Sequence, residues 1–530
     1  MKRIISRANA SMSIGMAATI ISGSFLLSSL LGLLRERLLA ARFGIDNGIL
    51  DAYWAAFSLP DLLYFFLVSG ALSVTFIPVL KKRLVEGKRR EAWELASNTI
   101  NFLSVITLIC SVLIFIFADP LVHLIAGGFD QPRHDLAVSL MRIIAINPFI
   151  FTISTVLGAM QQSVNRFFFF ALAPVLYNIG IIFGIITLSP HLGIVGVALG
   201  VAIGAILQLM LTIVGMVGMG FQYTWVLDMK NKGFREVVKH LIPRSLDQGM
   251  DNVNATIERL IASFLAVGSI TAFQYAYVLR NVPVVLIGVA ISTAAFPSIT
   301  ERAASTRTDL FRQEVQNVIK TIIWFALPAT AIAFLMRGYL IRLLIGNGNA
   351  LISDLLGWFA ISIVFRAIFH AVSRAFYAQQ DTKTPLFISI VAVSLNIFLA
   401  YYLALPLDLG VIGLAIAQSF IAVFEVGLLV LVLQGRLGGI VTRKFVFEGV
   451  KMTIATLVMS IATYLLVSRV FPLLAGDTGF FTLAPKFVGM VVVSAGVYLV
   501  ASYYVGLEEA KIVFRELNRR IFAPIRPSKL

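Results

Sequence analysis

Charged side chains inside long apolar runs are the residues of this sequence best suited to chemistry. Each costs roughly 2.5–3.5 kcal/mol to place in hydrocarbon, so such residues usually face a cavity or an ionic partner. Arginine also presents a planar fork of donors that matches phosphate oxygens in pairs. We therefore predict a polar cavity that binds an anionic substrate. Its candidate residues are Arg35, Glu36, Arg37, Asp51, Asp61, Arg259 and Arg280.

These charges also have a purely structural interpretation, in which they form internal salt bridges that close two lobes. The neighbours Glu36 and Arg37 suit that role. Asp61 and Arg280 lie 219 residues apart, at equivalent places of an internal repeat described below. They could face each other across the axis of that repeat. Because so many charges exceed what lobe contact requires, we favour the cavity.

Catalytic and metal-binding motifs are absent from the sequence. The single cysteine, Cys110, excludes a cysteine metal cluster, and the five histidines show no zinc-binding spacing. We find no nucleotide-binding loop and no nucleophile–base–acid set. Asp247 and Asp251, one helical turn apart, are candidates for a coupling cation, although a plain polar helix face explains them more simply. We expect a protein that is not an enzyme and has no cofactor.

The composition indicates that lipid solvates much of the chain. Of 530 residues, 59% are hydrophobic and 13% are charged, and the mean hydropathy is +0.91. Soluble domains have about 45–50% apolar and about 25% charged residues. A spanning helix needs about 20 apolar residues, and fourteen runs of that size occur. They centre near residues 11–34, 50–80, 96–118, 136–160, 167–189, 194–218, 240–266, 270–300, 315–336, 354–378, 386–405, 411–434, 446–470 and 486–506.

The net charge of +16 is distributed as a topology signal. Lysine and arginine cluster in alternate connections, such as Lys81–Arg90, whereas Ser189–Gly193 and Leu407–Gly410 have none. This alternation places the basic connections and both termini in the cytoplasm. The basic clusters would then contact anionic membrane lipids, and we expect no nucleic-acid partner.

The sequence repeats itself at an offset of about 219 residues. Ala71–Pro78 matches Ala290–Pro297, and Leu192–Ala198 matches Leu409–Ala415 at a similar offset. Six runs per copy make the two copies parallel, with the substrate site at their interface. We expect two parallel six-helix repeats plus two C-terminal helices. The predicted domains are lobes 1–220 and 221–440, two extra helices in 441–510 and a basic cytoplasmic tail in 511–530.

Several short motifs together are typical of one family. They are Leu31–Glu36, Arg42–Gly44, Asp51–Tyr53 with Leu59–Leu63, and Phe76–Pro78, with Gln380–Pro385 as a second hallmark. By these motifs the chain resembles, over essentially its whole length, the MurJ (MviN) family of lipid II flippases. The resemblance implies the multidrug/oligosaccharidyl-lipid/polysaccharide exporter superfamily and alternating access. It also implies a bacterial inner-membrane protein of peptidoglycan biosynthesis that moves undecaprenyl diphosphate-linked lipid II to the outer leaflet. The cell-wall synthesis machinery is a possible partner.

The family resemblance is uneven at the charged positions. Arg35 and Asp51 match charged residues of the family, and Glu36 replaces its usual aspartate. The resemblance further implies arginines where this chain has Ser29, Tyr64 and Val278, with Arg280 as a substitute for the last. The alternatives are a flippase for another polyprenyl-linked oligosaccharide and a multidrug or cation exporter of the same superfamily.

Overall fold

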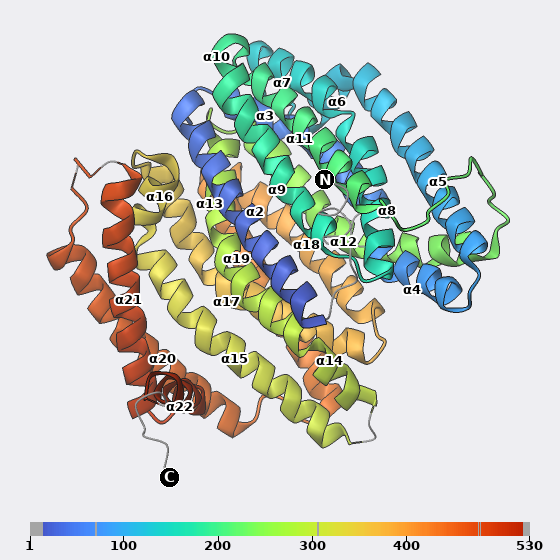
Figure 1. The fold of residues 1–530 in the computed structure, drawn as a ribbon. Coiled ribbons are helices and arrows are strands. Elements are labelled where there is room, and N and C mark those ends of the chain that lie inside the picture. The colour runs from blue at the N-terminus through green and yellow to red at the C-terminus, as the bar shows by residue number, and fades with distance from the viewer. Residues whose placement is uncertain (1–13, 69–70, 305–306, 475, 478, 523–530) are drawn as a thin grey trace. The chain divides into compact units, whose positions relative to one another are not determined.

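The computed structural model describes residues 14–68, 71–304, 307–474, 476–477 and 479–522. These residues are nearly all helical, and no strand occurs among them (Figure 1). Twelve helices within the described residues are long and apolar enough to cross a membrane. The prediction of an all-α polytopic membrane protein is confirmed.

The first compact unit covers residues Met1–Thr271. Its described helices are α2 (Ile14–Phe43), α3 (Ile49–Leu67), α4 (Ala71–Val85), α5 (Arg89–Ile116), α6 (Ala118–Ile125), α7 (Gln131–Ile144), α8 (Asn147–Ser163), α9 (Phe168–Phe183), the π-helix η1 (Gly184–Leu188), α10 (Ser189–Leu192), α11 (Ile194–Gly215) and α12 (Lys232–Ser263). Within it, α12 packs on α3 and α4, and α9 packs on α2 and α11.

Glycines bring α9 and α11 close together. A Cβ atom added at Gly200 would lie 2.6 Å from the Cα of Gly184, and one at Gly180 would lie 2.3 Å from the Cα of Gly204. Small residues allow such close backbone approach between helices in a membrane. The glycine-rich stretch Gly193–Gly204 is therefore a packing surface.

The second compact unit covers residues Ala272–Leu530 and begins within α13. Its described helices are α13 (Ser269–Pro283), the π-helix η2 (Val284–Val289), α14 (Ala290–Ala304), α15 (Thr308–Leu335), α16 (Arg337–Ile345), α17 (Ala350–Ala378), α18 (Lys383–Ala404), α19 (Gly410–Leu437), α20 (Arg443–Leu465), the π-helix η3 (Leu466–Val470), α21 (Phe480–Tyr504) and α22 (Glu508–Phe522). Here α19 packs on α17 and α18, and α15 packs on α17 and α20.

The two helices beyond the predicted repeat, α20 and α21, are attached to α15 by polar contacts within an aromatic cluster. Tyr498 of α21 donates a hydrogen bond to the Trp324 carbonyl oxygen (2.8 Å), and Trp324 Nε1 donates to Ser502 Oγ (3.3 Å). Lys320 of α15 also forms an ion pair with Glu448 of α20. These contacts join residues that are more than 120 positions apart in the sequence.

Two of the fourteen predicted spans differ from single apolar helices. The run at 50–80 is divided between α3 and α4. Most of the run at 240–266 lies in α12, which also carries Glu258 and Arg259. Neither is among the twelve helices of the described residues that meet the length and hydropathy requirement. The count of fourteen spans stays a prediction.

Helix starts recur at the offset seen in the sequence. The helices α4, α5, α6 and α7 begin at Ala71, Arg89, Ala118 and Gln131, and α14, α15, α16 and α17 each begin 219 residues later. This recurrence supports the proposed parallel repeat.

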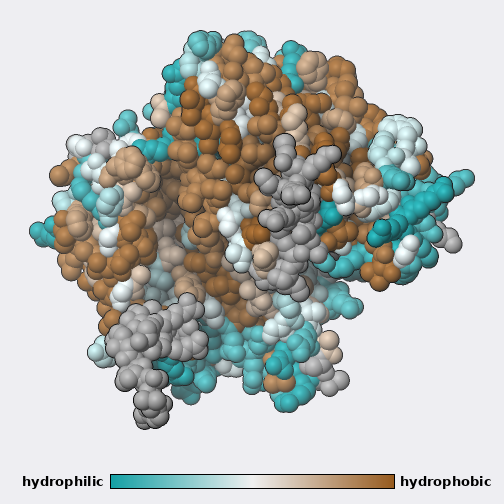
Figure 2. All heavy atoms as spheres, viewed as in Figure 1, coloured by the Kyte–Doolittle hydropathy of each residue, from teal (hydrophilic) through white to brown (hydrophobic). Residues whose placement is uncertain are grey.

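The sides of the helices are hydrophobic and exposed, as a lipid environment requires. Figure 2 shows hydrophobic residues over the helix sides and hydrophilic residues gathered toward helix ends. On α5, Ile109, Val112 and Phe115 are all exposed. Because these side chains have no protein neighbours to cover them, lipid would solvate them.

Candidate functional site

Arg35 lies near the C-terminal end of α2, held by an acid and an amide. Its Nη2 and Nε atoms donate to Glu36 Oε1 at 2.5 and 3.2 Å, and Nη1 donates to Asn178 Oδ1 of α9 at 3.3 Å. Asn178 in turn donates to Ser28 Oγ (3.1 Å). The Glu36 side chain is 1% exposed, whereas that of Arg35 is 21% exposed. The guanidinium is thus oriented yet partly accessible.

Asp61 and Arg259 extend this group of charges to α3 and α12. Arg259 Nη1 donates to Ser58 Oγ of α3 (3.1 Å), one helical turn before Asp61. Asp61 lies within electrostatic range of both Arg259 and Arg35. The structure therefore brings together Arg35, Glu36, Asp61 and Arg259 in the first unit; we call these four residues the charge cluster.

Arg37 does not share the side of α2 that carries Arg35. Residues two apart on a helix do not face each other, and Arg37 is partly buried. The two side chains therefore leave α2 on different sides.

Asp51 has a separate environment from the charge cluster. Its carboxylate is buried and accepts hydrogen bonds from Gly268 N (2.6 Å), Thr271 N (2.8 Å) and Thr271 Oγ1 (2.6 Å). Arg133 Nη1 lies 3.9 Å away. Ten helical residues separate Asp51 from Asp61, a rise of about 15 Å. Asp51 thus holds the connection that follows α12.

Arg280 belongs to the second unit, where its surroundings are aromatic. Its Nη1 donates to Gln418 Oε1 at 2.5 Å. The guanidinium carbon lies 4.4 Å from the ring centre of Tyr277 and 4.8 Å from that of Phe359. These cation–π contacts stabilise a buried arginine. The proposed pairing of Asp61 with Arg280 stays a prediction.

The candidate cation site at Asp247 and Asp251 lies on α12. The Asp251 side chain is exposed, and that of Asp247 lies outside the described part of the structure. Among the described side chains, no group of three or more histidine, cysteine, aspartate or glutamate residues is arranged to hold a metal ion.

Residues at two positions where the family resemblance implies arginine form hydrogen bonds within the first unit. Tyr64 OH lies 2.9 Å from Thr155 Oγ1, and Ser29 Oγ donates to the Phe25 carbonyl oxygen (2.9 Å). Sequence reasoning missed Asn178 and Ser58, which contact the cluster arginines. An asparagine inside the apolar run 167–189 was the available signal, because a buried amide requires polar partners.

Comparisons with known proteins agree with this architecture. The family model described as Lipid II flippase MurJ matches residues 39–483. A probable lipid II flippase MurJ of Rhizobium tropici is 24% identical over 535 residues, which cover 96% of this chain and 97% of that protein. The solved structure of a lipid II flippase MurJ in an inward closed conformation has a TM-score of 0.77 at 24% identity, and the match covers 94% of this chain and 100% of that one.

A multidrug transporter also shares the fold. An inward-facing multidrug resistance MATE family transporter of the MOP superfamily has a TM-score of 0.64 at 16% identity. The match covers 78% of this chain and 95% of that one. At this identity the likeness concerns the fold alone.

Proposed function

Because this chain belongs to the MurJ family of lipid II flippases, we propose that it translocates an undecaprenyl diphosphate-linked peptidoglycan precursor across the bacterial inner membrane. Transport runs from the inner to the outer leaflet by alternating access, and no bond is made or broken. The observation that carries the proposal is the charge cluster, in which arginines from α2 and α12 lie near carboxylates of α2 and α3.

The cluster suits a diphosphate that must be bound and then released. Arg35 and Arg259 supply two guanidinium groups, and paired hydrogen bonds from such groups match phosphate oxygens. Glu36 and Asp61 balance those charges when no substrate is bound. An incoming diphosphate therefore competes with carboxylates, and this competition limits its affinity enough for release.

The orientation of the chain follows from its basic connections. We place both termini, and the connection containing Lys81–Arg90, in the cytoplasm. In a Cys110→Ser background, a cysteine at Glu86 should be shielded from an impermeant thiol reagent in intact cells. A cysteine at Gln131 should be labelled. Labelling at Glu86 without permeabilisation would reverse the orientation.

The domain organisation proposed is a lobe of residues 1–220, a second lobe of 221–440, two extra helices in 441–510 and a basic tail in 511–530. The recurrence of helix starts at 219 residues supports two equivalent lobes. The cell-wall synthesis machinery and anionic lipids remain proposed partners.

A second candidate substrate is another polyprenyl diphosphate-linked oligosaccharide. The hydrogen-bonded Tyr64 and Ser29 favour it, because the phosphate-binding arginines then differ in position from those that the family resemblance implies. Rescue of a strain depleted of its own lipid II flippase distinguishes the two substrates. Failure to restore growth and lipid II exposure, at normal protein abundance, would favour the second.

Arg35 provides the direct test of the binding role. If Arg35 only extended toward lipid headgroups, lysine would serve equally well. If it binds a diphosphate, Arg35→Lys and Arg35→Ala both lose a charged contact of about 1.5–3 kcal/mol, or about one to two decades in affinity. We expect precursor exposure at the outer leaflet to fall at unchanged protein abundance. Wild-type exposure with Arg35→Lys would reject the role.

A further inference from the structure

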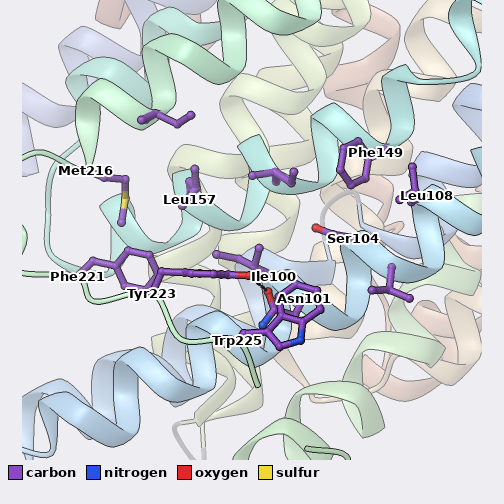
Figure 3. A pocket seen from close by; sticks show the side chains of 13 residues that line it. Ile100, Asn101, Ser104, Leu108, Phe149, Leu157, Met216, Phe221, Tyr223 and Trp225 are labelled. Atoms are coloured by element: carbon purple, nitrogen blue, oxygen red, sulfur yellow. Dashed lines mark hydrogen bonds between the residues drawn. The ribbon is translucent and has the colours of Figure 1, made fainter. Parts of the chain in front are cut away.

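A second feature of the first unit is an apolar cavity of about 530 Å³. Its lining comes from α5, α8, α11 and the segment after α11, and includes Ile100, Leu108, Phe149, Leu157, Phe221 and Trp225 (Figure 3). None of the charge-cluster residues lines it. Pockets of about 300–1,000 Å³ are large enough for drug-sized ligands.

The cavity opens toward the space that lipid occupies. The helices α5, α8 and α11 all belong to candidate membrane spans. Leu108 and Ile213, which line the cavity, are themselves exposed on the outer surface of α5 and α11. A bound molecule would therefore enter sideways from the bilayer.

One wall of the cavity is an extended segment fixed by polar side chains of α5. Asn98 donates from Nδ2 to the Asp228 carbonyl oxygen and accepts from Asp228 N, both at 2.8 Å. Asn101 donates to the carbonyl oxygens of Thr224 and Val226 (3.2 and 3.0 Å). Tyr223 OH donates to Asn101 Oδ1 (2.7 Å), as the dashed line in Figure 3 shows. The cavity is therefore preformed, because its wall has a defined position.

The same segment carries exposed aromatic rings. Trp225 is 71% exposed and Tyr223 is 53% exposed, although both line the cavity. Tryptophan and tyrosine concentrate where membrane and water meet, since their rings are apolar and their N–H or O–H groups are polar. The segment thus marks the headgroup level of the bilayer.

Basic residues contact or directly follow this segment. Lys230 follows the segment and is exposed. Arg235 donates to the Met229 carbonyl oxygen (3.0 Å), and Arg166 donates to the carbonyl oxygens of Val217 and Gly218 (3.0 Å each). Basic groups at headgroup level attract anionic lipids.

We propose that this cavity binds one acyl chain of an anionic phospholipid, whose headgroup phosphate lies against the basic residues around Lys230. An apolar cavity alone would accept any lipid chain. The adjoining positive charge selects a lipid with a net negative headgroup. The lipid is a resident ligand at a site separate from the charge cluster, so the inference does not depend on the transported substrate.

Fluorescence quenching by brominated lipids tests this site in the full-length protein. Trp358 is exposed, whereas Trp54, Trp93 and Trp324 are buried. In a Trp358→Phe variant in phosphatidylcholine nanodiscs, a brominated chain in the cavity would therefore quench mainly Trp225 and Trp93, whose ring packs on Phe221 of the cavity wall. We expect phosphatidylglycerol brominated on its acyl chains to quench severalfold more strongly than brominated phosphatidylcholine at equal mole fraction. Equal quenching by the two lipids would overturn the proposal.

Two substitutions test the cavity and the neighbouring positive charge separately. Ser104→Phe fills the cavity and should abolish the preference for phosphatidylglycerol, whereas Val112→Phe, on the exposed side of α5, should preserve it. Lys230→Gln should weaken the preference, and Lys230→Arg should retain it. Unchanged selectivity in both Ser104→Phe and Lys230→Gln would overturn the proposed site.

Native mass spectrometry tests the proposed lipid site in the unaltered protein. After exchange into detergent, we expect a retained phosphatidylglycerol molecule, and phosphatidylcholine offered at equal concentration should be lost first. Retention of a polyprenyl phosphate in place of a phospholipid, or no preference between the two phospholipids, would contradict the proposal.

Discussion

The two units each contain an arginine–carboxylate pair inside apolar helices, and the pairs differ in what they connect. Arg35 and Glu36 are neighbours on α2. Arg366 of α17 pairs with Glu425 of α19 (3.2 Å), and Glu425 also accepts from Ser389 of α18 (2.8 Å). The carboxylates are similarly buried, with 1% and 5% of their side chains exposed.

From this difference we infer that Arg35 and Glu36 form a binding group, whereas Arg366 and Glu425 fix the packing of their helices. A pair within one helix orients a guanidinium without tying that helix to another through the ion pair. A pair that joins three helices fixes their positions and has little freedom to exchange partners. Burial and charge alone do not distinguish these roles, whereas the sequence separation of the partners does.

The largest expected effect is a loss of stability when the Arg366–Glu425 pair is broken. Glu425→Gln leaves Arg366 inside the second unit without its carboxylate, and breaking a buried pair in this way costs about 3–5 kcal/mol. We expect a lower thermal unfolding temperature in detergent and lower abundance in the membrane. Glu36→Gln is the matched control and should lose much less stability. Equal losses in both variants would remove the distinction between the pairs.

A smaller effect, on substrate affinity, is expected at the Arg35–Glu36 pair. Glu36→Gln keeps a hydrogen-bond acceptor beside Arg35 but removes the negative charge that competes with substrate. We expect lipid II to bind about tenfold more tightly, equivalent to about 1.4 kcal/mol, and to be released more slowly. Titration of the purified protein with lipid II and a flipping assay measure the two changes. Glu36→Asp retains the charge and should retain wild-type affinity. Weaker binding by Glu36→Gln would contradict the proposed competition between the Glu36 carboxylate and the substrate diphosphate for Arg35.

The smallest effect is expected at an exposed pair in the second unit. Asp381 accepts hydrogen bonds from Arg436 (2.6 Å) and Thr384 (2.6 Å), in the connection before α18. Burial raises the pKa of the Asp381 carboxyl, but the hydrogen bonds outweigh it and lower that pKa to about 2. Pairs of this kind contribute about 0.2–1 kcal/mol. Asp381→Asn should therefore destabilise only slightly.

The direction of this pKa shift determines how the contribution of Asp381 to stability depends on pH. A folded-state pKa of about 2 lies below the unfolded value of about 3.9, so the contribution is present above about pH 4 and is lost as the pH falls toward 2. Thermal unfolding of wild type and Asp381→Asn should differ equally at pH 7 and pH 5. Asp354→Asn, exposed on α17, is the matched control. A difference that disappears between pH 7 and pH 5 would contradict the low pKa.

The sequence predicted the kind of site, a group of buried charges, better than it predicted which residues form that site. Arg35, Glu36, Asp61 and Arg259 stood out because charges inside apolar runs are costly, and all four lie in one unit. Asp51 stood out for the same reason, yet its partners are backbone and side-chain groups of Gly268 and Thr271. The cost of burying a charge indicates that a partner exists and does not indicate which.

The apolar periodicity and charge distribution by themselves determined that the chain is a helical membrane protein, because a bilayer accepts few other structures. Only the tertiary structure decided that Asn178 contacts Arg35 across 143 residues, and that Glu425 joins three helices. The cavity beside Trp225 also depends on tertiary structure, since hydrogen bonds from α5 hold its wall. Helix formation is a local property of the chain, whereas these contacts depend on which helices pack together and on the direction each side chain faces.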